Sequence, residues 1–408
     1  MGEKNMDLVI PKILKQASCE SIDKAMPPEQ TQYFNNRFKS TSYPKKDIKF
    51  MTYHGDPGMA PMTHRGVQAP TFKGGGVSEV SMQGALINEK IMYSEEEVND
   101  VLNAGDPVLR QAAEMVLLQK VEDLSTRNDL RKDWLGSQLF FNDGVISYIG
   151  EDGTKIYIDY KIPDANKTAL TSSLIWGTGA DREVAQDCAD IKKQVRRCGG
   201  PVSKVFINSD TLNSKLRDDT AIQAWVAKSA HPMKANIFTN PLAVMREFLD
   251  IPLEINDDYT TLSLILTGQA DSTHISVNDA TGLTAGTDFW VVRVNGDREE
   301  YEEKGTIDSI SGNTITVTSA MSGTFTPNAD IVMAEVPYLA DNKLVFVAEK
   351  VKGKDIMDWK DAPLGFKSQF GKQFKTWGVE DPDNILTRCQ RLGIWALKYP
   401  GAIASITV

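Results

Sequence analysis

The most extended pattern in the chain is a run of apolar residues at steps of three and four between residues 106 and 139. Such spacing predicts one long helix with an apolar stripe. Asp106 suits the N-cap and Pro107 the first helical position. The helix would be roughly 50 Å long, which indicates an elongated subunit; two helices with a break near Ser125 or Asn128 are the alternative. The stripe comprises Leu109, Ala113, Val116, Leu117, Val121, Leu124, Leu130, Trp134 and Leu135.

The first 46 residues have the pattern of an N-terminal arm. A short amphipathic helix is predicted at Met6–Gln16, and polar sequence interrupted by prolines follows it. A stretch of this composition cannot bury much of itself, so we expect it to be disordered or to lie across another subunit. The aromatic pair Tyr33 and Phe34 favours docking.

Residues 47–93 alternate short apolar runs with many glycines and prolines. Asp47–His54 is predicted to be a strand, and Gly74, Gly75 and Gly76 to give a flexible tip. The whole segment is interpreted as an extended two-stranded loop. Isolated hairpins are marginally stable in water, so a loop of this size requires a surface to lie on.

Residues 94–169 are predicted to form a peripheral domain around the long helix of residues 106–139. Ser94 and Glu97 have the spacing of a capping box and open a short helix. After the long helix, Val145–Ile149 and Ile156–Ile162 alternate as two strands of a hairpin with a turn at Asp152-Gly153. We expect this hairpin to pack on the helix.

From residue 170 to 260, strands alternate with helices, which indicates the first part of an axial α/β domain. One helix is predicted over Ala180–Arg197, and another after residue 209 with Asp210 as a possible cap. The α/β pattern resumes at Asp341–Lys350, so residues 336–375 are taken as its second part. Residues 376–408 are predicted to be C-terminal strands.

Residues 261–335 interrupt the α/β pattern with about six short strands, which predicts an inserted all-β barrel or sandwich. An inserted domain needs its two ends close together on the surface. The complete chain is therefore predicted to have an α+β fold with a small all-β insertion.

Composition places the chain among ordinary globular proteins of two or three domains, with 408 residues, 41% hydrophobic and 25% charged. It has no apolar run near 18 residues, and we expect no signal peptide or myristoylation. The net charge is −10, and the segment 261–335 holds 3 basic and 11 acidic residues. The other residues, 42 basic and 44 acidic, are nearly balanced. A dedicated nucleic-acid binder would have a clear basic footprint.

The cysteines show neither metal-ligand spacing nor an evident disulfide pattern. Cys188 and Cys198 stand ten residues apart on one predicted helix, and Cys19 and Cys389 lie far from them in the sequence. We interpret all four as reduced thiols of a protein that folds in the cytoplasm.

Candidates for chemistry are sparse. His54 and His64, with Asp56 nearby, lie in the predicted loop, while His231 precedes a proline and His274 lies in the β insert. All are interpreted as structural or exposed residues.

Three further segments are candidate binding sites. Trp176–Asp181 has two glycines before a helix and could hold an anion, although a simple loop with Asp181 as a cap is favoured. Glu299, Glu300, Glu302 and Glu303 could attract a divalent cation, although solvated acids are favoured. Gly74–Gly76 lacks the Gly-Lys-Ser/Thr of a phosphate loop. We therefore predict no catalytic, cofactor-binding or metal residues, no cofactor and no enzymatic role.

With these elements in this order, the chain resembles the major capsid proteins of lambda-like tailed bacteriophages, the phage capsid protein E family with the Hong Kong 97-type fold. The resemblance covers most of the chain outside the insert, and it rests on the order of several loose motifs. These are Arg65-Gly66 with residues 71–91, Ala104-Gly105-Asp106-Pro107 before the helix, residues 144–163, Trp176 with Asp190-Ile191, and Glu380-Asp381-Pro382 through Pro400 to the closing Ile-Thr-Val.

The resemblance implies a structural protein that self-assembles as hexamers and pentamers into an icosahedral shell around double-stranded DNA. Scaffolding protein, portal and a possible decoration protein would be its partners, DNA would be contacted non-specifically, and no membrane would be involved. The shell would form in the bacterial cytoplasm and become part of the virion. The segment 261–335 departs from the family, which has a shorter hairpin there; by resemblance the insert would project outward.

Three alternatives stay open at this point. A shell of the same fold could enclose a cargo enzyme, as in encapsulin-like nanocompartments. The chain could instead be an enzyme with an accessory carbohydrate-binding β domain. The insert could also bind sugars on the surface of a virion.

Overall fold

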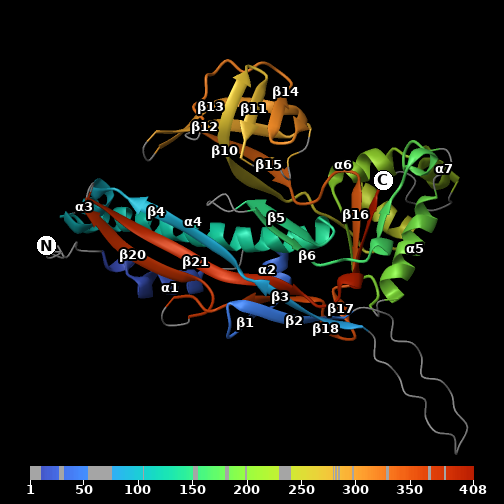
Figure 1. Ribbon diagram of the computed structural model, residues 1–408, viewed down its shortest axis with the longest axis horizontal. Coiled ribbons are helices and arrows are strands. Elements are labelled where there is room, and N and C mark those ends of the chain that lie inside the picture. Colours follow the sequence, from blue (N-terminus) through green and yellow to red (C-terminus); the bar gives the residue numbers. More distant parts are fainter. Residues whose placement is uncertain are drawn as a thin grey trace, which may run out of the picture. The chain divides into compact units, whose positions relative to one another are not determined.

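The computed structural model divides the chain into two compact units and has a mixed α/β fold (Figure 1). Unit 1 comprises residues 1–54, 59–136 and 354–399, and unit 2 comprises residues 55–58, 137–353 and 400–408. The structure describes residues 11–26, 32–53, 76–103, 105–149, 155–179, 183–197, 200–228, 240–278, 280, 283, 285–295, 298–327, 330–365, 369–380 and 383–408.

Unit 1 is built on a five-stranded sheet. Its strand order is β1 (Ser40–Ser42), β19 (Met357–Asp361), β21 (Asp383–Leu397) and β20 (Gln373–Glu380), and β4 (Ala85–Tyr93) also pairs with β21. A separate two-stranded sheet joins β2 (Asp47–Tyr53) to β3 (Val77–Gln83). The remaining elements are η1 (Lys12–Leu14), α1 (Gln16–Ala25), α2 (Tyr33–Arg37), α3 (Glu95–Asn103) and β18 (Lys354–Asp355).

Helix α4 (Pro107–Phe141) is one continuous helix of 35 residues, so the break considered near Ser125 is absent (Figure 1). The N-cap prediction is confirmed, because the backbone N–H of Val108 donates to Asp106 Oδ1 at 2.9 Å. The capping box of α3 is also present, with Ser94 N donating to Glu97 Oε2 at 3.2 Å and Glu97 N to Ser94 Oγ at 3.4 Å.

The core of unit 1 lies where α4 packs on the sheet. Leu117, Val121 and Leu124 of α4 cluster with side chains of β4, β20 and β21. Residues of β21 alternate between the two faces of the sheet, as strand geometry requires, and Ile385 and Cys389 lie on the face that packs on α4. The sheet side chains of the cluster are Tyr93, Phe374, Ile385 and Cys389.

The predicted apolar stripe of α4 is partly wrong. Leu109 is 65% exposed, Val116 49% and Leu130 38%. At about 100° per residue, Leu109 and Val116 point to the side of the helix, away from the direction of Leu117 and Val121. Steps of three and four residues connect residues on both of these sides of the helix, so the sequence pattern combined them into one stripe. The sheet covers only the side of Leu117 and Val121.

The prediction for the N-terminal arm is also corrected. Residues 1–10, with half of the helix predicted at Met6–Gln16, lie outside the described part of the chain; within that part, residues 12–14 form the 3-10 helix η1 and the first α-helix is α1 (Gln16–Ala25). Leu14 and Cys19 are fully buried in the core of the same unit. Phe34 is buried too, against Gly136 of α4, where an added Cβ would lie 2.8 Å from the ring. The described part of the arm therefore folds onto its own chain.

The predicted loop of residues 47–93 is shorter in the structure. Strands β2 and β3 pair antiparallel from Asp47↔Gln83 to Tyr53↔Val77, while residues 54–75 lie outside the described part. The next strand, β4, was predicted to belong to the loop, but it pairs with β21 over nine residues, from Tyr93↔Ile385 to Ala85↔Gly393. The alternation of apolar and polar residues in β4, which was interpreted as part of the extended two-stranded loop, is that of a strand within a larger sheet.

Unit 2 contains a second five-stranded sheet with the order β7 (Lys167–Ala169), β22 (Ile403–Thr407), β16 (Lys343–Val347), β8 (Lys204–Ile207) and β9 (Leu253–Ile255). All five residues of β16 are buried, as expected for a central strand. Its helical elements are η2 (Asp164–Asn166), η3 (Ser172–Leu174), α5 (Val184–Arg197), α6 (Ser209–Thr211), the π-helix η4 (Leu212–Arg217), α7 (Thr220–Lys228), α8 (Pro241–Leu249) and η6 (Pro400–Ala402), and β17 (Lys350–Val351) is a short strand.

Three predictions in this region are corrected. Helix α6 is capped by Asn208, whose side chain accepts from Thr211 N, rather than by Asp210. The second α/β segment, predicted over 336–375, does not reach β19, which pairs with β21 in unit 1. The C-terminal strands are divided as well, because β22 returns to the α/β sheet beside β16. Pairing between segments distant in sequence decided these boundaries, and no local pattern encodes it.

Residues 259–337 of unit 2 fold into a closed barrel, where the sequence predicted a small all-β segment over 261–335 (Figure 1). The strands close in the order β10 (Tyr259–Asp271), β11 (His274–Val277), β14 (Thr314–Val317), β13 (Arg298–Ser311), β12 (Asp288–Asn295) and β15 (Ile331–Pro337). Tyr259 pairs with Pro337, so the two ends of the barrel segment are adjacent.

The hairpin predicted after the long helix is confirmed as β5 (Val145–Ile149) paired with β6 (Lys155–Asp159). Residues 150–154, including the predicted turn at Asp152-Gly153, lie outside the described part. That the hairpin packs on the long helix stays a prediction.

The packing of α4 predicts unequal effects of two matched substitutions. Leu124 is 2% exposed and Leu109 65%. Leu124→Ala should lower the free energy of unfolding by about 2–5 kcal/mol, because it leaves a cavity in the core. Leu109→Ala should change it by less than about 0.5 kcal/mol. Denaturant unfolding of the unassembled chain measures both, and equal effects would contradict the packing of α4 described above.

Candidate functional site

A largely buried group of charged side chains in unit 1 lies where α4 meets the sheet and the N-terminal helices. We call its ionic core the charge network. Its members come from α1, α4, β19, β21 and the residue before β20, and every member has at least one partner of opposite charge close by. They are Asp23, Asp129, Lys132, Asp361, Lys372 and Arg391.

Arg391 is the most completely paired cation of the network, and 7% of it is exposed. Its Nε and Nη2 donate to Asp361 at 2.8 and 3.2 Å, and its Nη1 donates to Asp129 at 3.4 Å. The Trp359 indole N–H also donates to Asp361, at 2.6 Å. A bidentate guanidinium–carboxylate pair fixes direction as well as distance, so β21, β19 and α4 are held in one arrangement.

Lys372 joins α1 to α4. Its Nζ donates to Asp129 Oδ2 and Ser125 Oγ, each at 2.7 Å, and also forms an ion pair with Asp23. Ser125 Oγ in turn donates to Asp23. This single ammonium group therefore attaches helix α1 to the middle of the long helix α4.

Lys132 is the unusual member of the network. Its Nζ donates to Ser40 Oγ at 2.9 Å and lies over the rings of Trp359 and Trp395, 5.5 and 5.2 Å from their centroids. Burial, followed by repulsion from Arg391, lowers the pKa of Lys132 to about 7. A lysine of this kind can act as a base or nucleophile in an enzyme, but here its described neighbours are structural groups.

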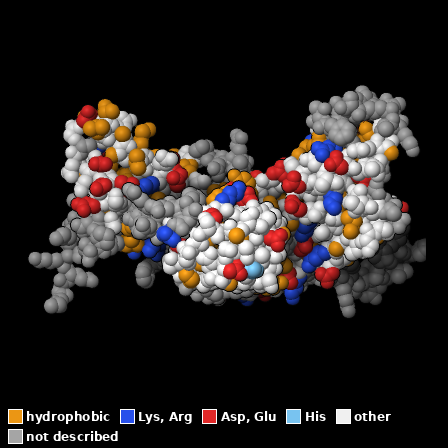
Figure 2. All heavy atoms as spheres, turned by 90° about the horizontal axis from the view of Figure 1, so that it is seen from above, with side chains coloured by type: hydrophobic (Ala, Val, Ile, Leu, Met, Phe, Trp, Pro, Cys, Tyr) orange, Lys and Arg blue, Asp and Glu red, His pale blue; other side chains and the backbone are white. Residues whose placement is uncertain are grey.

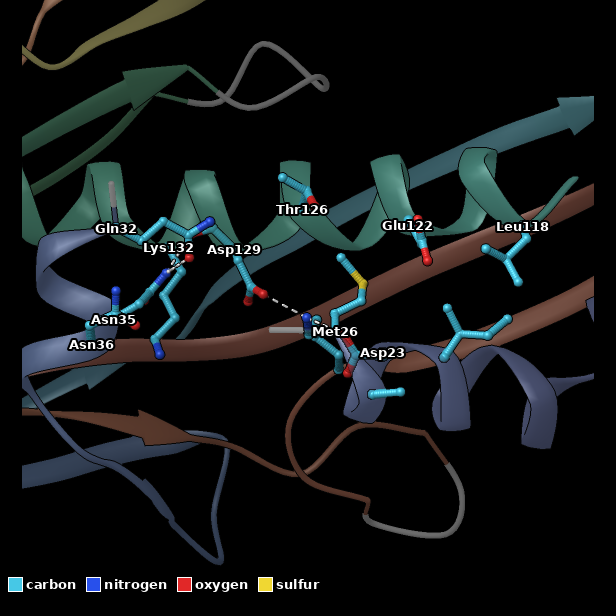
Figure 3. Close-up of a pocket in the computed structure, with 13 residues that line it drawn as sticks. Asp23, Met26, Gln32, Asn35, Asn36, Leu118, Glu122, Thr126, Asp129 and Lys132 are labelled. Atoms are coloured by element: carbon cyan, nitrogen blue, oxygen red, sulfur yellow. Dashed lines mark hydrogen bonds and ion pairs between the residues drawn. The ribbon is translucent and has the colours of Figure 1, made fainter. Parts of the chain in front are cut away.

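A pocket of about 630 Å³ opens beside the network, between α1, α2 and α4 (Figure 3). Its walls combine apolar surface from Ile22, Met26 and Leu118 with polar residues and charged residues of both signs. Figure 3 shows Glu122, Thr126 and Asp129 along α4, facing Asp23 and Met26 of the α1 region. Asn35 Nδ2 donates to Asp129 O, and Asn35 N to Asp133 Oδ1, each at 2.8 Å. The polar groups of α2 thus bind α4, and the arrangement is that of a structural joint.

The histidines do not assemble a site in the described structure. His54, His64 and His231, with Asp56, lie outside the described residues. His274 Nδ1 lies 2.9 Å from Asp271 Oδ1 on the barrel, and this contact holds the pKa of Asp271 well below its usual range. No group of three metal-ligating side chains occurs among the described residues.

The two candidate ion sites have internal partners instead. Gly177 N donates to the carboxylate of Asp219 at 3.1 Å, so the chain itself supplies the anion there; Asp181 is outside the described residues. Glu303 accepts from Ser322 N and Gly323 N at 2.9 Å. Burial alone would raise the pKa of Glu303, but these hydrogen bonds lower it. The side chains of Glu299, Glu300 and Glu302 are outside the described structure.

The described cysteines are free and buried. Burial raises the pKa of Cys19 to about 11 and that of Cys188 and Cys389 to about 12, which makes their thiols unreactive. Cys198 lies outside the described residues.

Sequence analysis did not identify the charge network. Its members are spread from residue 23 to residue 391, and only pairing in the sheet brings them together. One local signal was available, because Asn128 and Lys132 occupy core-facing positions of α4 and are 1% and 4% exposed. Polar residues at stripe positions indicate that polar partners face the helix.

Comparison with known proteins gives one family. The sequence model described as phage major capsid protein E matches residues 24–245, more than half of the chain. No curated protein matches the sequence. None of the described helices is both long and apolar enough to span a membrane.

Several solved structures are loosely similar. A prophage protein described as a capsid protein, from Escherichia coli CFT073, is 10% identical with a TM-score of 0.48, covering 97% of this chain and 99% of the other. A phage-related protein from Bordetella bronchiseptica RB50 is 8% identical with a TM-score of 0.46, covering 95% of each chain. The capsid structure of Staphylococcus phage Andhra is 9% identical with a TM-score of 0.42, covering 92% of this chain and 84% of the other. At these TM-scores the family assignment rests on the family model alone.

The depressed pKa of Lys132 predicts a specific pH dependence of stability. Between pH 7 and about 10.5, the unfolded chain holds this proton more strongly than the folded chain. The contribution of Lys132 to stability is therefore least favourable below pH 7 and rises with pH through this window. Lys132→Met should reduce that rise, whereas Lys39→Met, at an exposed position, should leave it unchanged. Unfolding free energies measured from pH 7 to 10 test this, and identical slopes in all three proteins would contradict it.

Proposed function

The chain belongs to the phage major capsid protein E family and is a structural major capsid protein of a phage, and we propose that its copies form the icosahedral head shell of a tailed bacteriophage around double-stranded DNA. Hexamers and pentamers are the proposed building units. The family assignment does not favour a cargo nanocompartment or an enzyme.

The observation that carries the proposal is the exposed apolar surface of the β2–β3 hairpin. One face of β2 is buried through Ile48, Phe50 and Thr52. On the opposite face, Met51 is 57% exposed and Tyr53 43%, and Val77 of β3 is 52% exposed. Exposed apolar groups on a hairpin are typical of a contact with another molecule, and in a shell the nearest molecule is a second copy of this chain.

The first turns of α4 supply a second surface of this kind. Val108, Leu109 and Met115 are 72%, 65% and 64% exposed. Figure 2 shows hydrophobic side chains in separate groups on the face in view, interspersed with acidic and basic ones. Two different apolar surfaces on one chain allow heterologous contacts, which close into rings.

The element order supports a Hong Kong 97-type layout. An N-terminal segment, a hairpin, the long helix α4 and an α/β sheet follow one another along the chain. The barrel lies between β9 and β16, and its adjacent ends suit an inserted domain. We propose that it faces outward, since an acidic surface would repel nucleic acids and other anions.

Assembly of such a shell would involve further proteins. A separate scaffolding protein would direct shell formation in the bacterial cytoplasm, a portal would admit the DNA, and a decoration protein could bind outside. The finished shell would be part of the virion.

An aspartate in the hairpin face should block assembly without unfolding the subunit. Met51→Asp places a carboxylate in the proposed contact, which should cost at least about 1.4 kcal/mol and reduce shell formation about tenfold or more. Ser42→Asp adds the same charge at an exposed position of β1, in the other sheet of unit 1, and should assemble normally. Sedimentation and electron microscopy count the shells, while circular dichroism checks the fold. Normal shells from Met51→Asp would contradict the role of this face.

A further inference from the structure

The sheet of unit 1 has a second face, opposite to α4, with a regular charge pattern. Because successive strand residues point to opposite faces, and Ile385 and Cys389 point to α4, the even-numbered residues of β21 point away. Arg388 is directly opposite Lys90 of β4 on one side and Lys375 of β20 on the other. Three cationic side chains therefore form one line across three strands, which we call the basic row.

The basic row is not neutralised by the chain itself. In the part of the chain that the structure describes, no carboxylate pairs with Lys90, Arg388 or Lys375, and Arg388 Nε is buried without a hydrogen-bond partner. Like charges directly opposite each other destabilise a sheet. Neighbouring strands are 4.7–4.9 Å apart, so the row spans roughly 10 Å. Such a line of unneutralised cations fits an extended anion.

The neighbouring side chains specify the kind of anion. Arg388 and Lys375 each lie 5.8 Å from the centroid of the Trp377 ring. An indole already occupied by two cations does not offer a free platform for an unstacked base, which single-stranded nucleic acid would use. On the other side of the row, Asn88 is directly opposite Gln390, and amides of this kind donate to phosphate oxygens.

We propose that the basic row, with Asn88 and Gln390 beside it, binds the phosphate backbone of double-stranded DNA without reading its sequence. This inference rests on the proposed function, in which the shell encloses such DNA, and it assigns the contact to one face of one sheet. Three cations on an otherwise nearly neutral body would bind weakly in one subunit and strongly when many copies line a shell. The overall charge of −10 therefore does not oppose it.

The test is the salt dependence of binding to a labelled random-sequence duplex, measured with the unassembled full-length chain. Lys90→Gln with Lys375→Gln removes two exposed charges and leaves the partly buried Arg388 in place. Each lost phosphate contact should lower the slope of log K against log salt by about 0.9, so the double variant should lose about 1.8. Lys45→Gln with Lys46→Gln removes two exposed charges elsewhere in unit 1 and should leave the slope unchanged.

Shell formation by the same variants is scored separately by electron microscopy. Weakened duplex binding with normal shells supports the inference. An unchanged slope overturns it. Loss of shells with unchanged duplex binding also overturns it, because the row would then bind an acidic surface of a second copy. If the unaltered chain formed no shells at all, the proposed function would fail, while the slopes would still decide whether the row binds phosphates.

Discussion

The contact between α4 and the sheet of unit 1 is the interaction on which the rest of that unit depends. Leu117, Val121 and Leu124 remove one side of the helix from water by packing on β4, β20 and β21. The strands on this side of the sheet come from residues 85–93 and 373–397, so the helix joins segments far apart in the sequence. Most of the stability of a helix in a protein comes from packing of its apolar face. The 35-residue helix α4 therefore depends on this contact with the sheet.

Between Leu124 and Leu135, which is buried again, the same helix face makes charged contacts. Hydrophobic burial is non-directional, whereas Arg391 holds Asp361 in bidentate geometry and Lys372 connects Asp23 to Asp129. The charge network fixes the position of α1, β19 and β21 along α4. A shell subunit needs this fixed arrangement, because errors in subunit geometry accumulate over many copies.

Local signals predicted the local structure well. The N-cap at Asp106, the capping box at Ser94 and Glu97, and the β5–β6 pairing are all present. The predictions were wrong where long-range pairing decides, as for β4, which lies against β21 rather than in a loop. The exposed side of α4 was misjudged at Leu109 and Val116 because periodicity cannot tell which of two neighbouring directions is covered. The charge network required the fold, since the ion pairs of Asp129 with Lys372 and Arg391 join residues more than 200 positions apart.

The two proposed functional surfaces, the apolar face of the β2–β3 hairpin and the basic row, also differ in whether the sequence alone reveals them. The apolar face at Met51 and Tyr53 is visible as strand alternation in the sequence, whereas the basic row exists only in the register of three strands. The central claim is that the exposed apolar surfaces are covered by further copies of the same chain in a closed shell. Electron microscopy of the purified chain, alone and with its scaffolding protein, tests this most directly. The account predicts closed icosahedral particles built of hexamers and pentamers; a chain that stays monomeric under both conditions would contradict it.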